Sequence, residues 1–295
     1  MHTTFQTVGL IGKRDDTNVA ETVTALIRYL DSSGIRVLLD ESVSPLADGS
    51  QMADGSPIEC VTTETIGEQC DLAIVVGGDG TLLSAARTLA DYQIPLAGVN
   101  LGRLGFLVDI SPDHLSNKMD EILRGHYLEE RRFLLQGDVY REGERIAGGL
   151  AFNDVVVHKW NLARMIELET YINDRFVNTQ RSDGLIISTP TGSSAYALSG
   201  GGPLLYPTLN AIVLVPVCPH TLSNRPIVVD GDSHIEVVVA DSNEERTQVT
   251  WDGQDSFSLR SGDRIKIYKR ERELRLIHPA NHDYFETLRA KLHWG

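Results

Sequence analysis

The sequence is poor in cysteine and in long hydrophobic runs. Its three cysteines are Cys60, Cys70 and Cys218. An odd number of cysteines does not suggest a disulfide framework, and no two of them have the spacing of metal ligands. The longest hydrophobic run, Ala211 to Val217, is far shorter than the roughly 20 residues that a membrane span requires. Residues 1–6 show no basic region followed by a hydrophobic one, so we expect no signal peptide. These absences predict a cytoplasmic protein without a membrane partner.

Positive charge is also scarce. The chain has 27 Lys and Arg against 41 Asp and Glu, a net charge of −14 over 295 residues. Such a chain repels nucleic acid, which we therefore exclude as a partner. An anionic ligand would need local compensation by Arg, Lys, a metal ion or helix N-termini. Hydrophobic residues make up 41% of the chain, which is enough for one large folded domain or two modest ones.

Two common nucleotide-binding motifs are missing. No G-x-G-x-x-G follows a predicted strand, and no G-x-x-x-x-G-K-[ST] occurs anywhere. The chain is therefore neither an ordinary Rossmann dinucleotide binder nor a P-loop NTPase by motif.

The first part of the chain alternates predicted strands with predicted helices. Hydrophobic, β-prone runs predict strands at residues 7–11, 35–39, 72–76 and 95–99, and helical periodicity predicts helices at 17–32, 82–92 and 112–125. Residues 42–57 are rich in turn formers and predict a loop. Alternation of this kind implies a parallel sheet covered on both faces.

From about Phe133 the pattern changes to short, often alternating segments separated by turn residues, with one short helix expected at 193–198 and another at 283–292. The predicted fold is an α/β N-terminal domain with an open, parallel, Rossmann-like sheet, followed by a C-terminal antiparallel β domain. We expect the first domain to comprise residues 1–130, completed by a returning tail at 277–295, and the β-rich substrate-binding domain to comprise 131–276.

The sharpest local motif is Gly77-Gly78-Asp79-Gly80-Thr81, directly after a predicted buried strand. In open α/β sheets ligands bind beyond the carboxyl ends of the strands. Glycines allow close approach of the backbone, and the N-terminus of the next helix, expected from about Thr81, favours phosphate. The alternative is that the motif is only a Gly-rich turn between a strand and a helix. In a phosphate-binding loop, the Asp carboxylate would repel the phosphates, so its presence there would indicate a specific role.

Two further motifs lie in the second half. Asn153-Asp154 precedes a predicted strand and can hydrogen-bond paired hydroxyls, as on a ribose, although a polar turn is the simpler reading of this dipeptide alone. The run from Arg181 to Pro203 contains Ser-Asp-Gly-Leu-Ile-Ile-Ser-Thr-Pro-Thr-Gly-Ser-Ser-Ala-Tyr. It predicts a buried strand leading to a helix N-terminus lined with hydroxyls, with Arg181 suited to phosphate.

In this order the three motifs resemble the ATP-dependent NAD kinases, over nearly the whole chain. The first loop alone is shared with lipid kinases and loosely with phosphofructokinases, whereas the third motif is far more specific. The resemblance implies a kinase that transfers the γ-phosphoryl group of ATP to the 2′-hydroxyl of the adenosine ribose of NAD, giving NADP. It also implies a homodimer or homotetramer and a divalent cation, Mg²⁺, carried by ATP and not by protein ligands.

The resemblance also implies roles for individual residues. Asp79 would contact the acceptor ribose hydroxyl as general base, and Gly80 would line the phosphate path. Asn153 and Asp154 would hold the nicotinamide-side ribose, and Arg181 and Asp183 would hold the substrate. The other implied substrate-binding residues are Arg164, Ser194, Ala195, Tyr196, Ala197, Leu198, Ser199 and Gln254.

Two alternatives stay open. A lipid kinase could share the Asp79 loop, although the net charge of −14 argues against an anionic membrane surface. A non-catalytic NADP(H)-binding sensor could lack the general base, yet Asp79 is present with its glycines. The scattered histidines His158, His278, His282 and His293 are expected to be solvated or structural.

Overall fold

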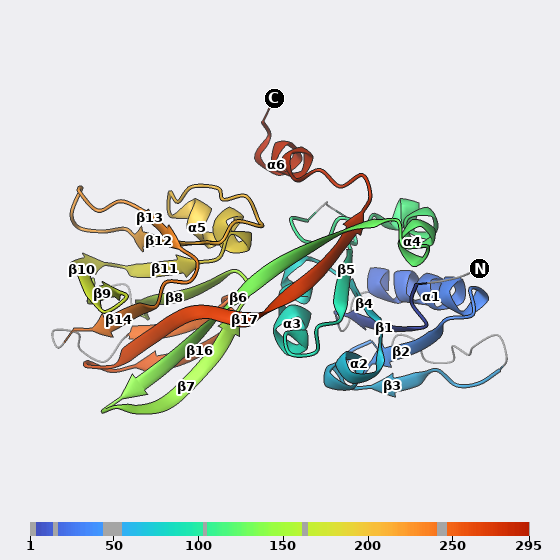
Figure 1. The fold of residues 1–295 in the computed structure, drawn as a ribbon, viewed down its shortest axis with the longest axis horizontal. Coiled ribbons are helices and arrows are strands. Elements are labelled where there is room, and N and C mark those ends of the chain that lie inside the picture. Colours follow the sequence, from blue (N-terminus) through green and yellow to red (C-terminus); the bar gives the residue numbers. More distant parts are fainter. Residues whose placement is uncertain are drawn as a thin grey trace. The chain divides into compact units, whose positions relative to one another are not determined.

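The structure is a computed structural model, and it describes residues 4–13, 17–43, 55–102, 105–160, 165–240 and 247–294. The chain forms two compact units (Figure 1). Unit 1 comprises residues 1–131 and 274–295, and unit 2 comprises residues 132–273. The chain passes between the units within two long strands, β6 (Tyr127–Arg141) and β17 (Arg264–Pro279).

Unit 1 contains a parallel sheet with the strand order β3-β2-β1-β4-β5-β17. The strands are β1 (Thr7–Gly12), β2 (Arg36–Asp40), β3 (Glu59–Val61), β4 (Leu72–Val76) and β5 (Pro95–Val99). Strands β4 and β5 are buried along their whole length, as expected for strands with helices on both faces. The predicted α/β class is confirmed.

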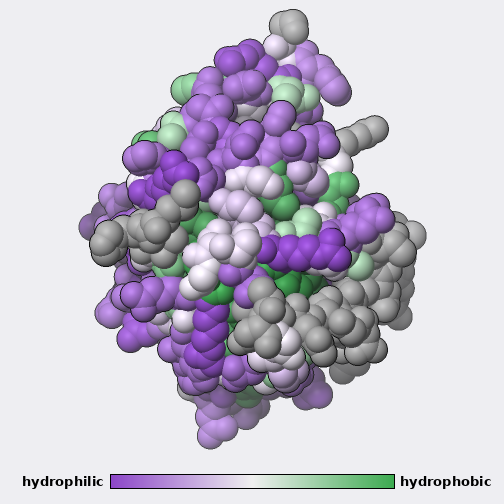
Figure 2. Space-filling model, turned by 90° about the vertical axis from the view of Figure 1, so that its right-hand side faces the viewer, coloured by the Kyte–Doolittle hydropathy of each residue, from purple (hydrophilic) through white to green (hydrophobic). Residues whose placement is uncertain are grey.

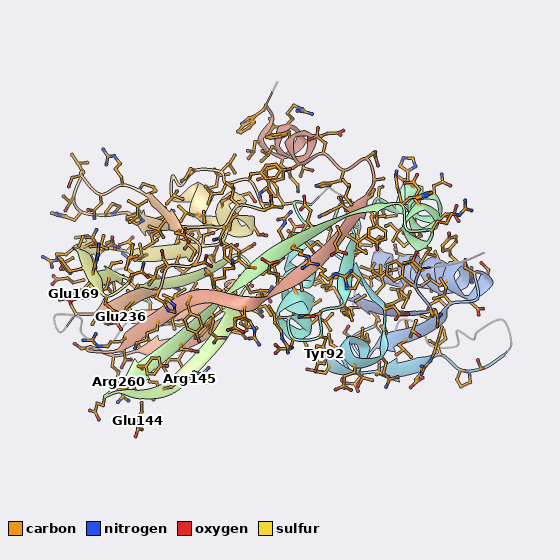
Figure 3. The ribbon with its side chains drawn as sticks, viewed as in Figure 1. Tyr92, Glu144, Arg145, Glu169, Glu236 and Arg260 are labelled. Carbon is orange, nitrogen blue, oxygen red and sulfur yellow. The ribbon has the colours of Figure 1, made fainter. Side chains whose placement is uncertain are left out.

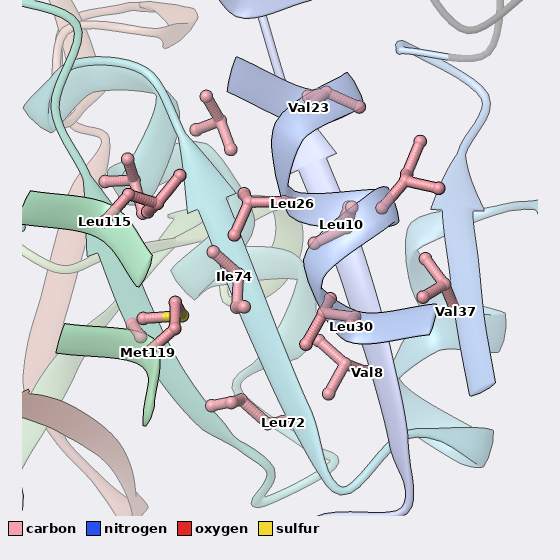
Figure 4. Packing of buried hydrophobic residues seen from close by; sticks show 14 of the residues in the cluster. Val8, Leu10, Val23, Leu26, Leu30, Val37, Leu72, Ile74, Leu115 and Met119 are labelled. Carbon is pink, nitrogen blue, oxygen red and sulfur yellow. The ribbon is translucent and has the colours of Figure 1, made fainter. Parts of the chain in front are cut away.

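The helices of unit 1 are α1 (Thr17–Ser32), α2 (Thr63–Gln69), α3 (Asp79–Leu89), α4 (Leu115–Leu123) and α6 (Tyr284–Leu292). On one face of the sheet, Leu26 of α1 and Met119 of α4 pack in a core with Leu10 (Figure 4). On the opposite face α2 approaches so closely that a Cβ at Gly9 would lie 2.3 Å from the side chain of Ile66. None of the helices in the described ranges is long and hydrophobic enough to cross a membrane.

Four elements of unit 1 differ from the sequence-based expectation. The single helix predicted at 112–125 is a 3-10 turn (Pro112–His114) followed by α4. The short strand β3 and the helix α2 were not predicted, because three and seven residues are too few to show a clear period. Helix α3 begins at Asp79, three residues before the predicted start at Leu82. Gly78 is extended and ends the turn, so Asp79 and Gly80 belong to the first helical turn. Most of the predicted loop at 42–57 lies outside the described residues.

Unit 2 consists of antiparallel strands, as predicted, in two groups. One sheet has the order β13-β12-β11-β8-β15-β16, and the other strands follow the order β10-β9-β14-β17, with β6 and β7 alongside. The strands are β7 (Glu144–Ala151), β8 (Asp154–Lys159), β9 (Ile166–Ile172), β10 (Arg175–Ser182), β11 (Gly184–Ser188), β12 (Ala211–Val217), β13 (Ile227–Asp230), β14 (Ile235–Val239), β15 (Thr247–Trp251) and β16 (Asp255–Leu259).

A single hydrophobic cluster joins the two groups of strands in unit 2. Val155 and Val157 of β8 pack in it with Leu168 of β9 and Ile265 of β17. Arg145 of β7, Glu169 of β9 and Glu236 of β14 are labelled in Figure 3. Because alternate residues of β8 face the core, Asp154, Val156 and His158 point to the other face of their sheet.

Candidate nucleotide site

The Gly-Gly-Asp-Gly-Thr motif comprises the turn after β4 and the first residues of α3, at the carboxyl end of β4. A Cβ on Gly77 would lie 2.6 Å from Oγ1 of Thr81, so the fold itself requires glycine there. A Cβ on Gly78 would have no atom of the described chain within 4 Å, and the φ of Gly78 is −96°. The folded chain therefore gives no reason for glycine at position 78, whereas a ligand that approaches the backbone would.

Asp79 joins this turn to the loop that follows β5. Its carboxylate accepts hydrogen bonds from the backbone N–H groups of Phe106 (3.0 Å), Leu107 (3.0 Å) and Val108 (3.3 Å). A Cβ on Gly105 would lie 2.3 Å from Oδ1 of Asp79. The two Gly-rich segments that the sequence shows separately thus meet at one carboxylate.

Unit 2 holds a cavity of about 460 Å³, a size within the range of small-molecule sites. Strand β8 contributes Asp154, Val156 and His158, and the neighbouring strand β15 contributes Gln248 and Thr250. The remaining lining residues are Asn153, Ala195, Tyr196, Asp252 and Gly253. Four residues predicted from the sequence, at positions 153, 154, 195 and 196, therefore line the same cavity.

Asp252 organises one end of this cavity. It occupies the tight turn between β15 and β16 with a φ of 52°, followed by Gly253 with a φ of 62°, as in an Asp-Gly hairpin turn. Its carboxylate accepts hydrogen bonds from the backbone N–H groups of Phe152 (2.9 Å), Asn153 (2.7 Å) and Asp154 (3.1 Å). The segment that carries the Asn-Asp pair is thus fixed by a carboxylate about a hundred residues away.

Asp154 is the buried acid of the cavity. Burial, and to a smaller extent the charge of Asp252, raise the pKa of Asp154 to about 7. A carboxyl group with this pKa donates a hydrogen bond when protonated and only accepts when ionised. It can therefore pair with a ribose hydroxyl in either state.

The Thr-Pro-Thr-Gly-Ser-Ser segment differs from the prediction of a hydroxyl-lined helix N-terminus. Its residues 191–194 form a 3-10 helix, and α5 (Tyr196–Ser199) has only four residues. The hydroxyl of Thr189 donates to the carbonyl of Phe152 (2.7 Å), and that of Ser193 donates to the carbonyl of Pro190 (2.7 Å). These hydroxyls are used inside the fold, where they hold the segment against residues 152–153 and position Ala195 and Tyr196.

The remaining predicted site residues are not among those that line this cavity. Arg181 lies 3.7 Å from Glu167, with two thirds of its side chain exposed, and Asp183 lies 2.5 Å from Lys159. Ala197 is buried in a hydrophobic cluster with Val156. Ser194, Leu198 and Ser199 are partly exposed or exposed around α5, Gln254 is exposed at the end of the Asp252 turn, and Gly80 is exposed in α3. Arg164 lies outside the described residues.

Strand pairing gives the distance that a ligand in this cavity could span. Asp154 pairs with Ser188 at one end of β8 and β11, and His158 pairs with Gly184 at the other end, next to Asp183. Four residues of extended strand cover about 13 Å. Asp183, whose carboxylate pairs with Lys159, is not among the residues that line the cavity.

Sequence reasoning missed six lining residues, which are Val156, His158, Gln248, Thr250, Asp252 and Gly253. His158 was expected to be structural or solvated, but it lines the cavity, and its Nε2 lies 2.9 Å from the amide nitrogen of Gln248. The Asp-Gly pair at 252–253 signals a hairpin turn. No local pattern shows that its carboxylate reaches residues 152–154.

Comparisons with known proteins agree with this architecture. Residues 8–127 match the ATP-NAD kinase N-terminal domain and residues 152–279 match the ATP-NAD kinase C-terminal domain. Fold and motifs thus define a two-domain phosphotransferase. The chain belongs to the ATP-NAD kinase family.

Named relatives and solved structures support the same assignment. The chain is 50% identical to the NAD kinase of Nitrosococcus oceani over 291 residues, 99% of this chain and 97% of the relative. It is 49% identical to that of Pseudomonas entomophila over 99% of this chain and 96% of the relative. The crystal structure of an NAD kinase from Archaeoglobus fulgidus in complex with ATP matches with a TM-score of 0.75 and 26% identity, over 97% of this chain and 98% of that one. Yeast NADH kinase complexed with NADH shares the fold, with a TM-score of 0.86 at 24% identity, over 97% of this chain and 86% of that one.

Proposed function

We propose that this protein transfers the γ-phosphoryl group of ATP to the 2′-hydroxyl of the adenosine ribose of NAD, giving NADP and ADP. The family relationship over the whole chain supports this activity. The observation that carries it is the turn at residues 77–81, where Gly78 faces open space beside the anchored carboxylate of Asp79. Such a turn suits a phosphate chain next to an acceptor hydroxyl.

Asp79 is the proposed general base. A carboxylate has about four lone-pair sites, and three N–H groups from residues 106–108 approach this one. One site is left for the ribose O–H, whose proton would move to Asp79 as the new P–O bond forms and the bond to ADP breaks. The three N–H donors hold the carboxylate in place, so that little reorientation is needed at the moment of transfer.

The other binding roles are proposals that follow from the family motifs. Asn153 and Asp154 would hold the nicotinamide-side ribose in the unit 2 cavity, with Ala195 and Tyr196 at its wall. Asp183 and Arg181 would bind near the far end of β8. The remaining proposed contacts are Gly80, Arg164, Ser194, Ala197, Leu198, Ser199 and Gln254.

The divalent cation is proposed to be Mg²⁺ bound to the phosphates of ATP, where it would neutralise charge during transfer. The donor set of the turn fits this arrangement, because the Asp79 carboxylate is already engaged by backbone N–H groups. We further propose a homodimer or homotetramer in the cytoplasm. The three cysteines are free thiols, which suits a reducing compartment.

The test is NADP formation from NAD and Mg-ATP by the purified protein, detected with an NADP-specific dehydrogenase. We expect a signal that requires both ATP and a divalent cation. If folded protein produces no NADP with ATP or polyphosphate and several metals, the kinase proposal fails. Binding of NADP without turnover would then favour a sensor, and phosphorylation of diacylglycerol in vesicles would favour a lipid kinase. Hydrophilic residues dominate the described part of the face shown in Figure 2.

A further inference from the structure

A buried cluster of two histidines and one aspartate lies in unit 1, apart from the residues to which we assign catalysis and substrate binding. Nδ1 of His278 lies 2.9 Å from Oδ2 of Asp109, and Nδ1 of His282 lies 2.7 Å from the same oxygen. The two imidazole rings stack with their centroids 4.1 Å apart. One ligand atom from each residue lies within 4.8 Å of the others. Two histidines four residues apart and an aspartate 169 residues before the first of them thus bring their donor atoms to one place.

Local structure explains the convergence. His278 lies near the end of β17, and the backbone N–H of His282 donates to the carbonyl of Pro279 (2.9 Å), which turns the chain back. Asp109 precedes Ile110, which bridges Val99 at the end of β5. Because β5 and β17 are parallel neighbours, the segments that follow them meet at the same edge of the sheet.

Two atoms of the cluster have no hydrogen-bond partner among the described residues, although both are buried. They are Oδ1 of Asp109 and Nε2 of His278, and the two side chains are only 7% and 1% exposed. Buried polar atoms without partners are rare in folded proteins. Nε2 of His278 faces Oε2 of Glu130 at 3.5 Å, an orientation that suits an N–H group directed at a carboxylate.

We propose that Asp109, His278 and His282 form a binding site for a divalent transition-metal ion such as Zn²⁺. Two imidazoles and one carboxylate suit zinc, cobalt or iron, whereas Mg²⁺ prefers oxygen ligands. Tetrahedral ligands on bonds of 2.0–2.1 Å lie about 3.3 Å apart, so each Nδ1 atom needs to move only about half an ångström from Oδ2 of Asp109. The stacked rings must also tilt apart, because the lone pair of each nitrogen lies in its ring plane. The cation would take the place of the hydrogens on the two Nδ1 atoms, which would leave as protons.

Glu130 fits this assignment. A metal-bound histidine usually donates its other ring N–H to a carboxylate, which orients the ring. Glu130 occupies that place beside Nε2 of His278. The cation would link the segments after β5 and β17, three residues from the Phe106 N–H that contacts Asp79. The proposal concerns this cluster alone and does not depend on the kinase activity.

Without a metal the same residues form a buried ion-pair network. Both histidines lie against Asp109, and His278 also faces Glu130. A metal must then compete with protons, so its affinity should rise with pH.

The test is titration of the untagged full-length protein with Co²⁺ at pH 8, followed by visible absorption. We expect one saturable equivalent with the intense d–d bands of four- or five-coordinate cobalt, displaced by Zn²⁺. His282→Gln and Asp109→Asn should each weaken binding at least tenfold, and Glu130→Gln by about 10- to 100-fold. The matched control is His114→Gln, which changes an exposed histidine of the same unit and should bind as the wild type does.

Several outcomes would overturn the proposal. They are the lack of a saturable cobalt spectrum in the wild-type protein, a thiolate-to-cobalt band that would place the metal at a cysteine, and equal binding by the cluster variants. If the variants do not fold, NMR of the wild-type imidazole signals decides the question. Paramagnetic broadening by Co²⁺ should affect the signals of His278 and His282 first, and broadening of other histidines alone would contradict the site.

Discussion

Replacing Asp79 by asparagine separates the two roles that the structure gives this side chain. The carboxylate fixes the loop at residues 106–108 through three backbone N–H groups, and it is the proposed base. Asn has nearly the same shape but no charge, one acceptor oxygen and one NH₂ group. The variant Asp79→Asn should therefore disturb both stability and turnover, each by an amount that can be worked out separately.

The stability effect follows from the hydrogen bonds. If the amide oxygen takes the place of Oδ1, it can still accept from Leu107 and Val108, but the NH₂ group then faces the N–H of Phe106. One bond to a charged acceptor, worth about 1.5–3 kcal/mol, is lost. The favourable charge in the first turn of α3 is lost as well, at about 0.3–1 kcal/mol. We expect the free energy of unfolding to fall by about 2–4 kcal/mol, measured by urea denaturation.

The effect on catalysis is larger. Removal of a general base lowers turnover by about 10²–10⁴-fold. The assay is NADP formation at saturating NAD and Mg-ATP, at a temperature where the variant is folded. Calorimetric titration with NAD should show affinity within a few-fold of the wild type, because the unit 2 cavity is unchanged. A non-catalytic sensor would instead form no NADP, either as the wild type or as the variant.

The control is Asp113→Asn, an exposed aspartate of the same unit, which should leave stability and turnover nearly unchanged. If Asp79→Asn keeps more than about a tenth of the wild-type kcat, the base role is refuted. An unchanged free energy of unfolding would refute the role of the three N–H contacts.

Three further substitutions test the site. Gly105→Ala would place a methyl group 2.3 Å from Oδ1 of Asp79. It should reduce turnover, and it should lower the free energy of unfolding by about 1–3 kcal/mol. Gly102→Ala, where no atom of the described residues lies within 4 Å of the added Cβ, should leave the free energy of unfolding nearly unchanged. Gly78→Ala should leave the unfolding curve nearly unchanged but raise KM for ATP, and an unchanged KM would contradict a phosphate site there. The pKa of Asp154 is raised from 3.8 to about 7, so this carboxyl group ionises more readily in the unfolded chain. As pH rises from 4 to 7, the free energy of unfolding of the wild type should therefore fall by up to about 4 kcal/mol relative to that of Asp154→Asn. A stability difference independent of pH would show that Asp154 titrates normally.

The elements that the sequence predicts well are those with a strong local period. The runs at 72–76 and 95–99 are uniformly hydrophobic and β-prone, and they form β4 and β5 with those bounds. In unit 2, the short alternating segments expected from Phe133 onwards include β9, most of whose residues alternate between buried and half-buried. The strand β3 has no such signal, because its three residues gain their order from pairing with β2.

Site residues are predictable only where one local segment carries several of them. Asn153, Asp154, Ala195 and Tyr196 belong to motifs that the sequence displays, and the fold brings them to one cavity. His158 and Gln248 carry no motif, since they meet through the pairing of β8 with β15, ninety residues apart. The histidines at 278 and 282 were likewise expected to be structural, and only the fold shows that both meet Asp109.

The two anchored carboxylates show why the sequence does not reveal such a site in full. Asp79 holds the N–H groups of residues 106–108, and Asp252 holds those of residues 152–154. In both cases an aspartate at a turn that contains glycine fixes the backbone of a distant loop. The loop held by Asp252 contains Asn153 and Asp154, and the loop held by Asp79 lies beside the proposed base. Backbone N–H groups have no side-chain identity, so no residue pattern marks the acceptor's partners. The same contacts make the loops costly to move, because each carboxylate would lose two or three charge-assisted bonds at once. We therefore infer that both loops are set before the substrates bind, and that binding energy is not spent on ordering them.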